Sequence, residues 1–188
     1  MLAAQADVAR LAGCASVAGL TIRSGGTLDL SPLRALTSIT GDLVIGPTVG
    51  IEDVTLGALR TITGTLHVVG NGLMQGLFFR ALTETGPIEI AGNAVLSTIA
   101  LPALTAVHGA LRVTGNANLE LLDLSALASV DQALSVTRAP RLTLLDAPQL
   151  HAAARVELDA PKLPPEVAAA LRAVAPAPVH PPPAASSP

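Results

Sequence analysis

The sequence predicts a mainly β protein, a parallel β-helix or solenoid in which short strands from successive turns of the chain stack into ladders. Three observations carry this prediction: an internal repeat, an alternation of apolar and polar side chains within it, and turn-forming residues at fixed places between the strands. The chain has 188 residues and 50% of them are hydrophobic, so it is long enough for one repeat array with a sizeable core.

The repeat is clearest in a run in which Leu or Ile is followed two residues later by Ile or Val. This run recurs at intervals of 23, 22, 23 and 23 residues, beginning at Leu43, Leu66, Ile88, Leu111 and Leu134. Weaker copies begin at Leu20 and Val156. The array is therefore predicted to contain about seven coils.

Two further columns keep the same register. A glycine stands two residues before four of these runs, at Gly41, Gly64, Gly86 and Gly109. A Gly-Asn pair follows three of them and places the asparagines at Asn71, Asn93 and Asn116. Because equivalent residues of stacked coils superpose, we expect each asparagine to hydrogen-bond to the turn backbone of an adjacent coil.

Each coil is expected to hold two short strands, for example residues 111–113 and 122–124. Neighbouring coils then pair as parallel strands about 4.8 Å apart. One coil buries too few side chains to fold alone, so stability is collective and both ends of the stack need a cover. Residues 14–160 are assigned to this solenoid.

The segments on either side supply candidate covers. Residues 1–13 are predicted to contain a short helix that ends at Gly13, and residues 161–174 a helix that Pro165 opens. Residues 175–188 are rich in Pro, Ala and Ser and are predicted to form an extended tail, because proline lacks the N–H that a helix or sheet requires.

Composition argues against several classes of partner and cofactor. Phe78 and Phe79 are the two aromatic residues, which removes the stacking platforms of nucleic-acid binders, and a net charge of −3 leaves no basic footprint. No apolar run is long enough to insert into a membrane. The single Cys14 permits neither an internal disulfide nor a multi-cysteine metal site, and no cofactor motif is present.

Cys14 also ends a Leu-Ala-Gly-Cys run of the kind at which bacterial lipoproteins are lipidated. Asp7 and Arg10 interrupt the apolar stretch that such a signal requires, so neither lipidation nor a signal peptide is expected in this chain.

The order of columns resembles the receptor L domain, the leucine-rich β-helix of insulin- and growth-factor-receptor ectodomains, which has related repeats in fungal cell-wall surface proteins and in bacterial proteins. The resemblance rests on Leu101, Leu104, Val107, Gly109, Leu111, Val113 and Gly115-Asn116, and on the opening segment 11–22. It implies a right-handed helix of coils and a cell-surface or envelope location, and the regular coils favour a bacterial relative. The family's usual disulfide partner for Cys14 is absent from this chain.

The alternative fold is the leucine-rich-repeat horseshoe, which also places an asparagine shortly after a strand. That motif keeps two residues where this chain keeps three with a glycine, as in the segment 107–111. Pro102 also leaves little room for a helix on the convex side, so the β-helix is preferred.

The best candidate site is a row of polar residues on one outward face. His67, Glu89 and Arg112 occupy the same position on three successive coils, and Thr65, Thr114 and Ser135 flank them. Either the row keeps an open sheet soluble or it forms a protein-binding surface. No nucleophile joins the row, so no catalytic residue is assigned.

Two features are expected on a second outward face. Asp123 and Asp146 stack one coil apart and offer too few oxygens for a metal ion, so no metal site is assigned. Phe78 is either an exposed anchor for a partner or a side chain covered by a loop.

The sequence thus predicts a non-enzymatic interaction module that binds a protein partner on an outward sheet face. The alternative is a structural solenoid that self-associates end to end, as parallel β-helices do when their caps are weak.

Overall fold

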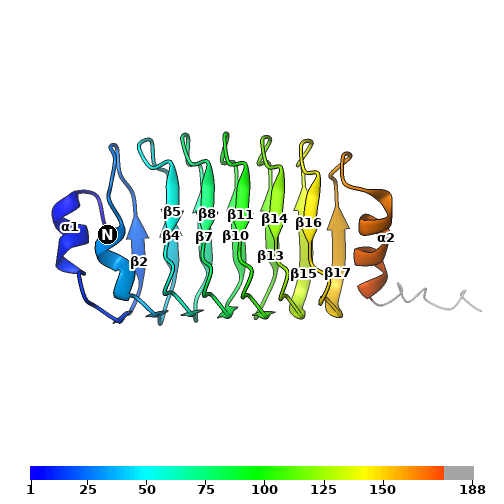
Figure 1. The fold of residues 1–188 in the computed structure, drawn as a ribbon, viewed down its shortest axis with the longest axis horizontal. Coiled ribbons are helices and arrows are strands. Elements are labelled where there is room, and N and C mark those ends of the chain that lie inside the picture. The colour runs from blue at the N-terminus through cyan, green and yellow to red at the C-terminus, as the bar shows by residue number, and fades with distance from the viewer. Residues whose placement is uncertain (176–188) are drawn as a thin grey trace, which may run out of the picture.

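A computed structural model describes residues 1–175 of the chain (Figure 1). The Pro-rich tail predicted for residues 175–188 lies outside the described residues, apart from Ala175.

The chain winds into a parallel β-solenoid of about six turns with a short helix at each end, as predicted. The face formed by the recurring run carries seven strands, which matches the seven copies of that run in the sequence. Every strand pair is parallel, and Glu89 lies beside His67 on one side and Arg112 on the other. The column of runs is therefore a continuous ladder.

The strands form three faces. The first face holds β1 (Ser16–Val17), β3 (Ser38–Ile39), β6 (Thr61–Ile62), β9 (Glu84–Thr85), β12 (Ala106–Val107) and the starts of β15 (Ser129–Thr137) and β17 (Ala152–Leu158). The second face holds β2 (Leu20–Ile22), β4 (Leu43–Ile45), β7 (Leu66–Val69), β10 (Ile88–Ala91), β13 (Leu111–Thr114) and the ends of β15 and β17. The third face holds β5 (Asp53–Thr55), β8 (Gly76–Phe78), β11 (Thr98–Ala100), β14 (Leu121–Asp123) and β16 (Leu144–Asp146).

The prediction of two strands per coil was wrong, because the central coils have three. The strand that the sequence analysis missed is the two-residue strand of the first face, in which Val107 and its equivalents point inward and are buried. A two-residue strand shows no alternation of its own, and the following glycine made the segment read as a turn.

The inward-facing columns fill the interior with aliphatic side chains. The column of six leucines at residues 36, 59, 82, 104, 127 and 150 is buried throughout, with at most 7% of any member exposed. Phe79 is fully buried among them, whereas Phe78, the next residue back, faces outward. This packing, repeated from coil to coil, supplies the apolar burial that one coil alone lacks.

The predicted asparagine ladder is confirmed. Asn71 donates from Nδ2 to the carbonyl of Ile45 at 3.1 Å, and Asn93 donates in the same way to Val68 at 2.9 Å. The side-chain oxygen of Asn93 also accepts from the backbone N–H of Asn71 at 3.0 Å. All three asparagines are fully buried, so the ladder satisfies backbone groups that water does not reach.

The glycine column forms the corner between the first and second faces. A Cβ on Gly41 would lie 2.3 Å from the carbonyl oxygen of Ala18, and one on Gly86 would lie 2.4 Å from that of Gly64. These glycines are required because successive coils approach backbone to backbone at this corner.

The N-terminal cover is helix α1 (Gln5–Arg10), and Gly13 follows it with a φ of 80°. Before this helix, Leu2 makes a parallel bridge to Ile22 and so pairs with the open edge of β2. The Gln5 side chain donates to the carbonyl of Asp29 and accepts from its N–H, which satisfies backbone groups of the first coil.

At the other end, helix α2 (Pro165–Val174) packs against β17 and buries Leu171. Arg172 donates to the carbonyl of Leu158 at 3.1 Å, at the end of the last strand. In the first coil, a 3₁₀ helix, η1 (Ser31–Ala35), overlaps the position at which later coils have their third-face strand. Pro32 lies in this helix and lacks the N–H that a strand pairing would use.

Candidate functional site

The structure brings His67, Glu89 and Arg112 together on the second face, where their strands are in register. His67 Nδ1 lies 3.1 Å from Glu89 Oε2, so these two side chains form a hydrogen-bonded pair. Both side chains are partly exposed, at 37% and 48%. The charge of Glu89 is therefore directed toward His67.

A second paired group lies further along the same row. Ser135 donates to Glu157 Oε2 at 3.1 Å, and Arg155 forms an ion pair with the same carboxylate group. Arg112 stands between this group and the His67–Glu89 pair. Within residues 1–175 it has no carboxylate within 4.0 Å, so the row presents one exposed, uncompensated guanidinium.

The flanking threonines have different neighbours. Thr65 donates its backbone N–H to Asp42 Oδ1 at 2.7 Å, which fixes the entrance to β7. Thr114 Oγ1 lies 2.9 Å from Thr137 Oγ1, and Arg138 Nη2 donates to Thr114 at 3.3 Å. Thr114 therefore belongs to a polar group at the end of the second-face strands.

Phe78 is placed apart from the other candidates, on the third face. Its ring lies over Gly76 of the same strand, where a Cβ would come within 2.2 Å of the ring. The side chain is half-buried, and the absence of a side chain at Gly76 leaves room for the ring. Asp123 and Asp146 are neighbours on this face, as their spacing predicted.

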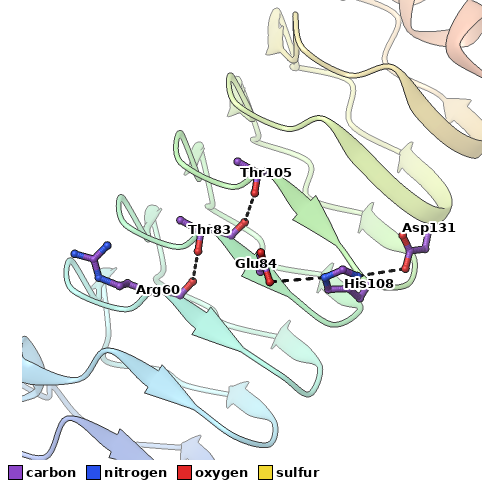
Figure 2. Close-up of polar contacts among 6 residues, drawn as sticks. All are labelled: Arg60, Thr83, Glu84, Thr105, His108 and Asp131. Atoms are coloured by element: carbon purple, nitrogen blue, oxygen red, sulfur yellow. Dashed lines mark hydrogen bonds and ion pairs between the residues drawn. The ribbon is translucent and has the colours of Figure 1, made fainter.

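The sequence analysis missed a cluster on the first face, formed by Glu84, His108 and Asp131 (Figure 2). His108 Nδ1 lies 3.4 Å from Asp131 Oδ2, and His108 Nε2 lies 3.9 Å from Glu84 Oε2. Each carboxylate thus lies next to a different nitrogen of one imidazole ring. This arrangement does not converge on one ion, and among the described residues no cluster suits a metal.

A 23-residue spacing between His108 and Asp131 was the available signal for this cluster. Its significance was missed because no strand was expected on the first face. All three side chains are more than half exposed, so their ion pairs contribute little to stability.

A threonine column runs beside this cluster. Thr83 donates from Oγ1 to the carbonyl of Arg60 at 3.0 Å, and Thr105 donates to the carbonyl of Thr83 at 2.9 Å (Figure 2). These hydroxyls link successive coils and are not aimed at an open site. The column therefore has a structural role.

Two carboxyl groups at the N-terminal cover have altered acidity. The backbone N–H groups of Ala3 and Ala4 donate to Asp7 and hold the pKa of its carboxyl below the ordinary value. The backbone and hydroxyl of Ser31 lower the pKa of Asp29 in the same way. Asp7 belongs to the cover and Asp29 to the first coil beside it, so neither group lies in the second-face row.

Comparison of the chain with protein-family models, with curated proteins and with solved structures finds no match. What the fold defines is the class, a parallel β-solenoid capped at both ends. Among residues 1–175, no helix has the length and apolar character needed to cross a bilayer.

Proposed function

We propose that this protein is a non-enzymatic interaction module that binds a protein partner on its second face, around Arg112. The resemblance of its columns to the receptor L domain supports display at the cell surface or envelope. It also supports a relationship to that family.

The observation that carries this proposal is which side chains of the row contact one another. His67 and Glu89 form a hydrogen-bonded pair and Arg155 and Glu157 form an ion pair, whereas Arg112 is exposed between them without a carboxylate within 4.0 Å in the described residues. A row that served solubility alone would have no reason to leave its central charge unpaired while pairing its neighbours. An exposed guanidinium on a flat sheet is suited to a carboxylate of a partner.

The alternative, end-to-end self-association, requires weakly covered ends. Here Leu2 pairs with the first edge strand, and α2 packs against the last. These covers oppose the addition of a further coil from another molecule. Sedimentation at rising protein concentration tests this alternative, and a steadily growing species would favour self-association.

Site-specific photo-crosslinking in the organism of origin tests the proposal. A photoreactive residue replaces either Ala91 in β10 on the second face or Ala100 in β11 on the third face. Both alanines are half-buried and point outward from a strand, so they are matched controls. We expect a discrete protein adduct from position 91 alone.

The same adduct is then sought in a chain in which His67, Glu89 and Arg112 are replaced together by serine. Because these side chains point outward, the fold should remain, as far-ultraviolet circular dichroism would verify. The adduct should be lost or strongly reduced. Equal adducts from positions 91 and 100, or an unchanged adduct in the triple variant, would contradict the proposal.

A further inference from the structure

Arg138 occupies a position that glycine holds in the three preceding coils. Gly70, Gly92 and Gly115 have φ angles of 70°, 62° and 67°, and Arg138 keeps the same left-handed backbone with a φ of 52°. It is the one non-glycine residue with positive φ in the part of the chain that the structure describes. A left-handed arginine is uncommon, and residues held in this way concentrate at functional sites.

The side chain of Arg138 reaches back one coil to the second face. Its Nη2 donates to Thr114 Oγ1 at 3.3 Å, and Thr114 is an outward-facing residue of β13. Arg112 lies two residues earlier in the same strand and therefore points to the same side, about 7 Å away along the strand. The two guanidinium groups thus share one region of the face.

Neither arginine has a carboxylate partner within 4.0 Å among the residues that the structure covers. Arg23 on the same side is also without one, but it donates to the carbonyl of Gly46 on the first coils. The two guanidinium groups therefore keep donors free for carboxylates of a partner, although Glu89 is the strand neighbour of Arg112 and Asp159 accepts from the backbone of Arg138.

A shallow cavity of about 390 Å³ adjoins Arg138. Its walls include Ala117, Pro140 and Pro161, which are apolar, and Asp159, whose Oδ2 accepts the backbone N–H of Arg138 at 3.3 Å. The cavity lies where the asparagine column has ended and Ala139 stands in its place. An aliphatic side chain of a ligand fits this lining.

We propose that the second face recognises an acidic segment of its protein partner, with carboxylates bound by Arg112 and Arg138 and a neighbouring aliphatic side chain in the cavity beside Arg138. This inference rests on the proposed function and adds the chemistry of the partner. Charge complementarity favours this occupant over a basic or uncharged segment.

The test uses the full chain and three blocked peptides, with alternating Glu and Leu, alternating Lys and Leu, or alternating Glu and Ser. Binding is followed by NMR, through the backbone amides of Thr114, Ala117 and Ala139 and the Nε–H signals of the arginines. The Glu–Leu peptide should shift these signals, the Glu–Ser peptide should bind more weakly, and the Lys–Leu peptide should have no effect. Added salt should weaken binding.

Three variants locate the site. Arg112→Gln and Arg138→Asn each remove one charge, and asparagine tolerates the left-handed backbone at position 138. Each should weaken binding of the Glu–Leu peptide about threefold, and the double variant about tenfold, because the contacts are exposed. Arg141→Gln removes an exposed arginine that lines a different cavity and should change nothing.

Absence of shifts with the Glu–Leu peptide would overturn the inference, as would equal binding of the Lys–Leu peptide or an equal loss in Arg141→Gln. The crosslinking experiment separates this failure from failure of the proposed function. An adduct at position 91 that depends on Arg112 would preserve the proposed function even when acidic peptides do not bind.

Discussion

The central coils and the last coil differ at the two positions that set the repeat. In the last coil, Ala139 stands where the central coils have the ladder asparagine, and Gln132 stands where they have the corner glycine. In the central coils β12 and β13 are separate strands with Gly109 between them, whereas β15 runs without a break from Ser129 to Thr137. Its pairing with β17 is irregular between Val130 and Ala133.

This difference shows what each column does. A central coil must accept another coil of the same kind on both sides, so its corner must be free of side chains and its turn polar groups must be bonded. The coil that contains β15 is followed by one further strand, β17, and then by helix α2, so these requirements end there. Positions released from the ladder become available for surface chemistry, and Arg138 is the clearest case.

The largest expected effect is at the centre of the ladder. Replacing Asn93 with Ala removes the side-chain hydrogen bonds to the N–H of Asn71 and the carbonyl of Val68 in a buried site, and one of the two hydrogen bonds that the side-chain oxygen of Asn116 accepts from residue 93. We expect a loss of about 3 kcal/mol in the free energy of unfolding, measured by urea denaturation.

The control is Asn118→Ala. Asn118 is half-buried and donates to the carbonyl of Ala94 at 2.7 Å through a hydrogen bond that water can reach, so water replaces the contact and the loss should be below about 1 kcal/mol. Equal losses of stability in Asn93→Ala and Asn118→Ala would show that burial of the asparagine ladder does not increase its contribution to the free energy of unfolding.

The glycine corner is tested by Gly86→Ala. The added Cβ would lie 2.4 Å from the carbonyl oxygen of Gly64, so the coils must move apart at a cost of about 2 kcal/mol. Gly57→Ala is the matched control, because nothing lies within 4 Å of its Cβ and its stability should be unchanged or slightly higher. Denaturation midpoints measured side by side distinguish the two, and a tolerated Gly86→Ala would refute close packing at this corner.

The central coils were largely predictable and the last coil was not. The row of His67, Glu89 and Arg112 could be predicted from the repeat spacing, because residues at equivalent positions of successive coils become neighbours on adjacent strands. The contact of Arg138 with Thr114 depends on how a long side chain turns at the end of a strand, which spacing does not specify. The column register does align Arg138 with Gly115, and this was the signal that could have revealed its backbone.

One position in the central coils is suboptimal, and a substitution there should raise the stability of the protein. Thr85 is buried in a column otherwise made of Ile, Val and, in the last strand, Ala153, and its hydroxyl has no hydrogen-bond partner within the described residues. Thr85→Val should therefore raise the free energy of unfolding by about 1.5 kcal/mol. Thr48→Val is the control, since the Thr48 hydroxyl donates to Asn71 Oδ1 at 2.8 Å and its loss should destabilise the protein. Destabilisation by both substitutions would indicate that the Thr85 hydroxyl is bonded in solution.

The smallest expected effect concerns the backbone of Arg138. Arg138→Gly and Arg138→Ala both remove the guanidinium and its contact with Thr114, but only glycine adopts a φ of 52° without steric cost. The glycine variant should be more stable than the alanine variant by about 1 kcal/mol, the reverse of the order found within strands and helices. Thermal and urea denaturation of the two proteins measure this difference. If alanine proves the more stable, the last coil does not hold the left-handed turn that the central coils use, and the contrast between the two regions lies in their backbones as well as in their side chains.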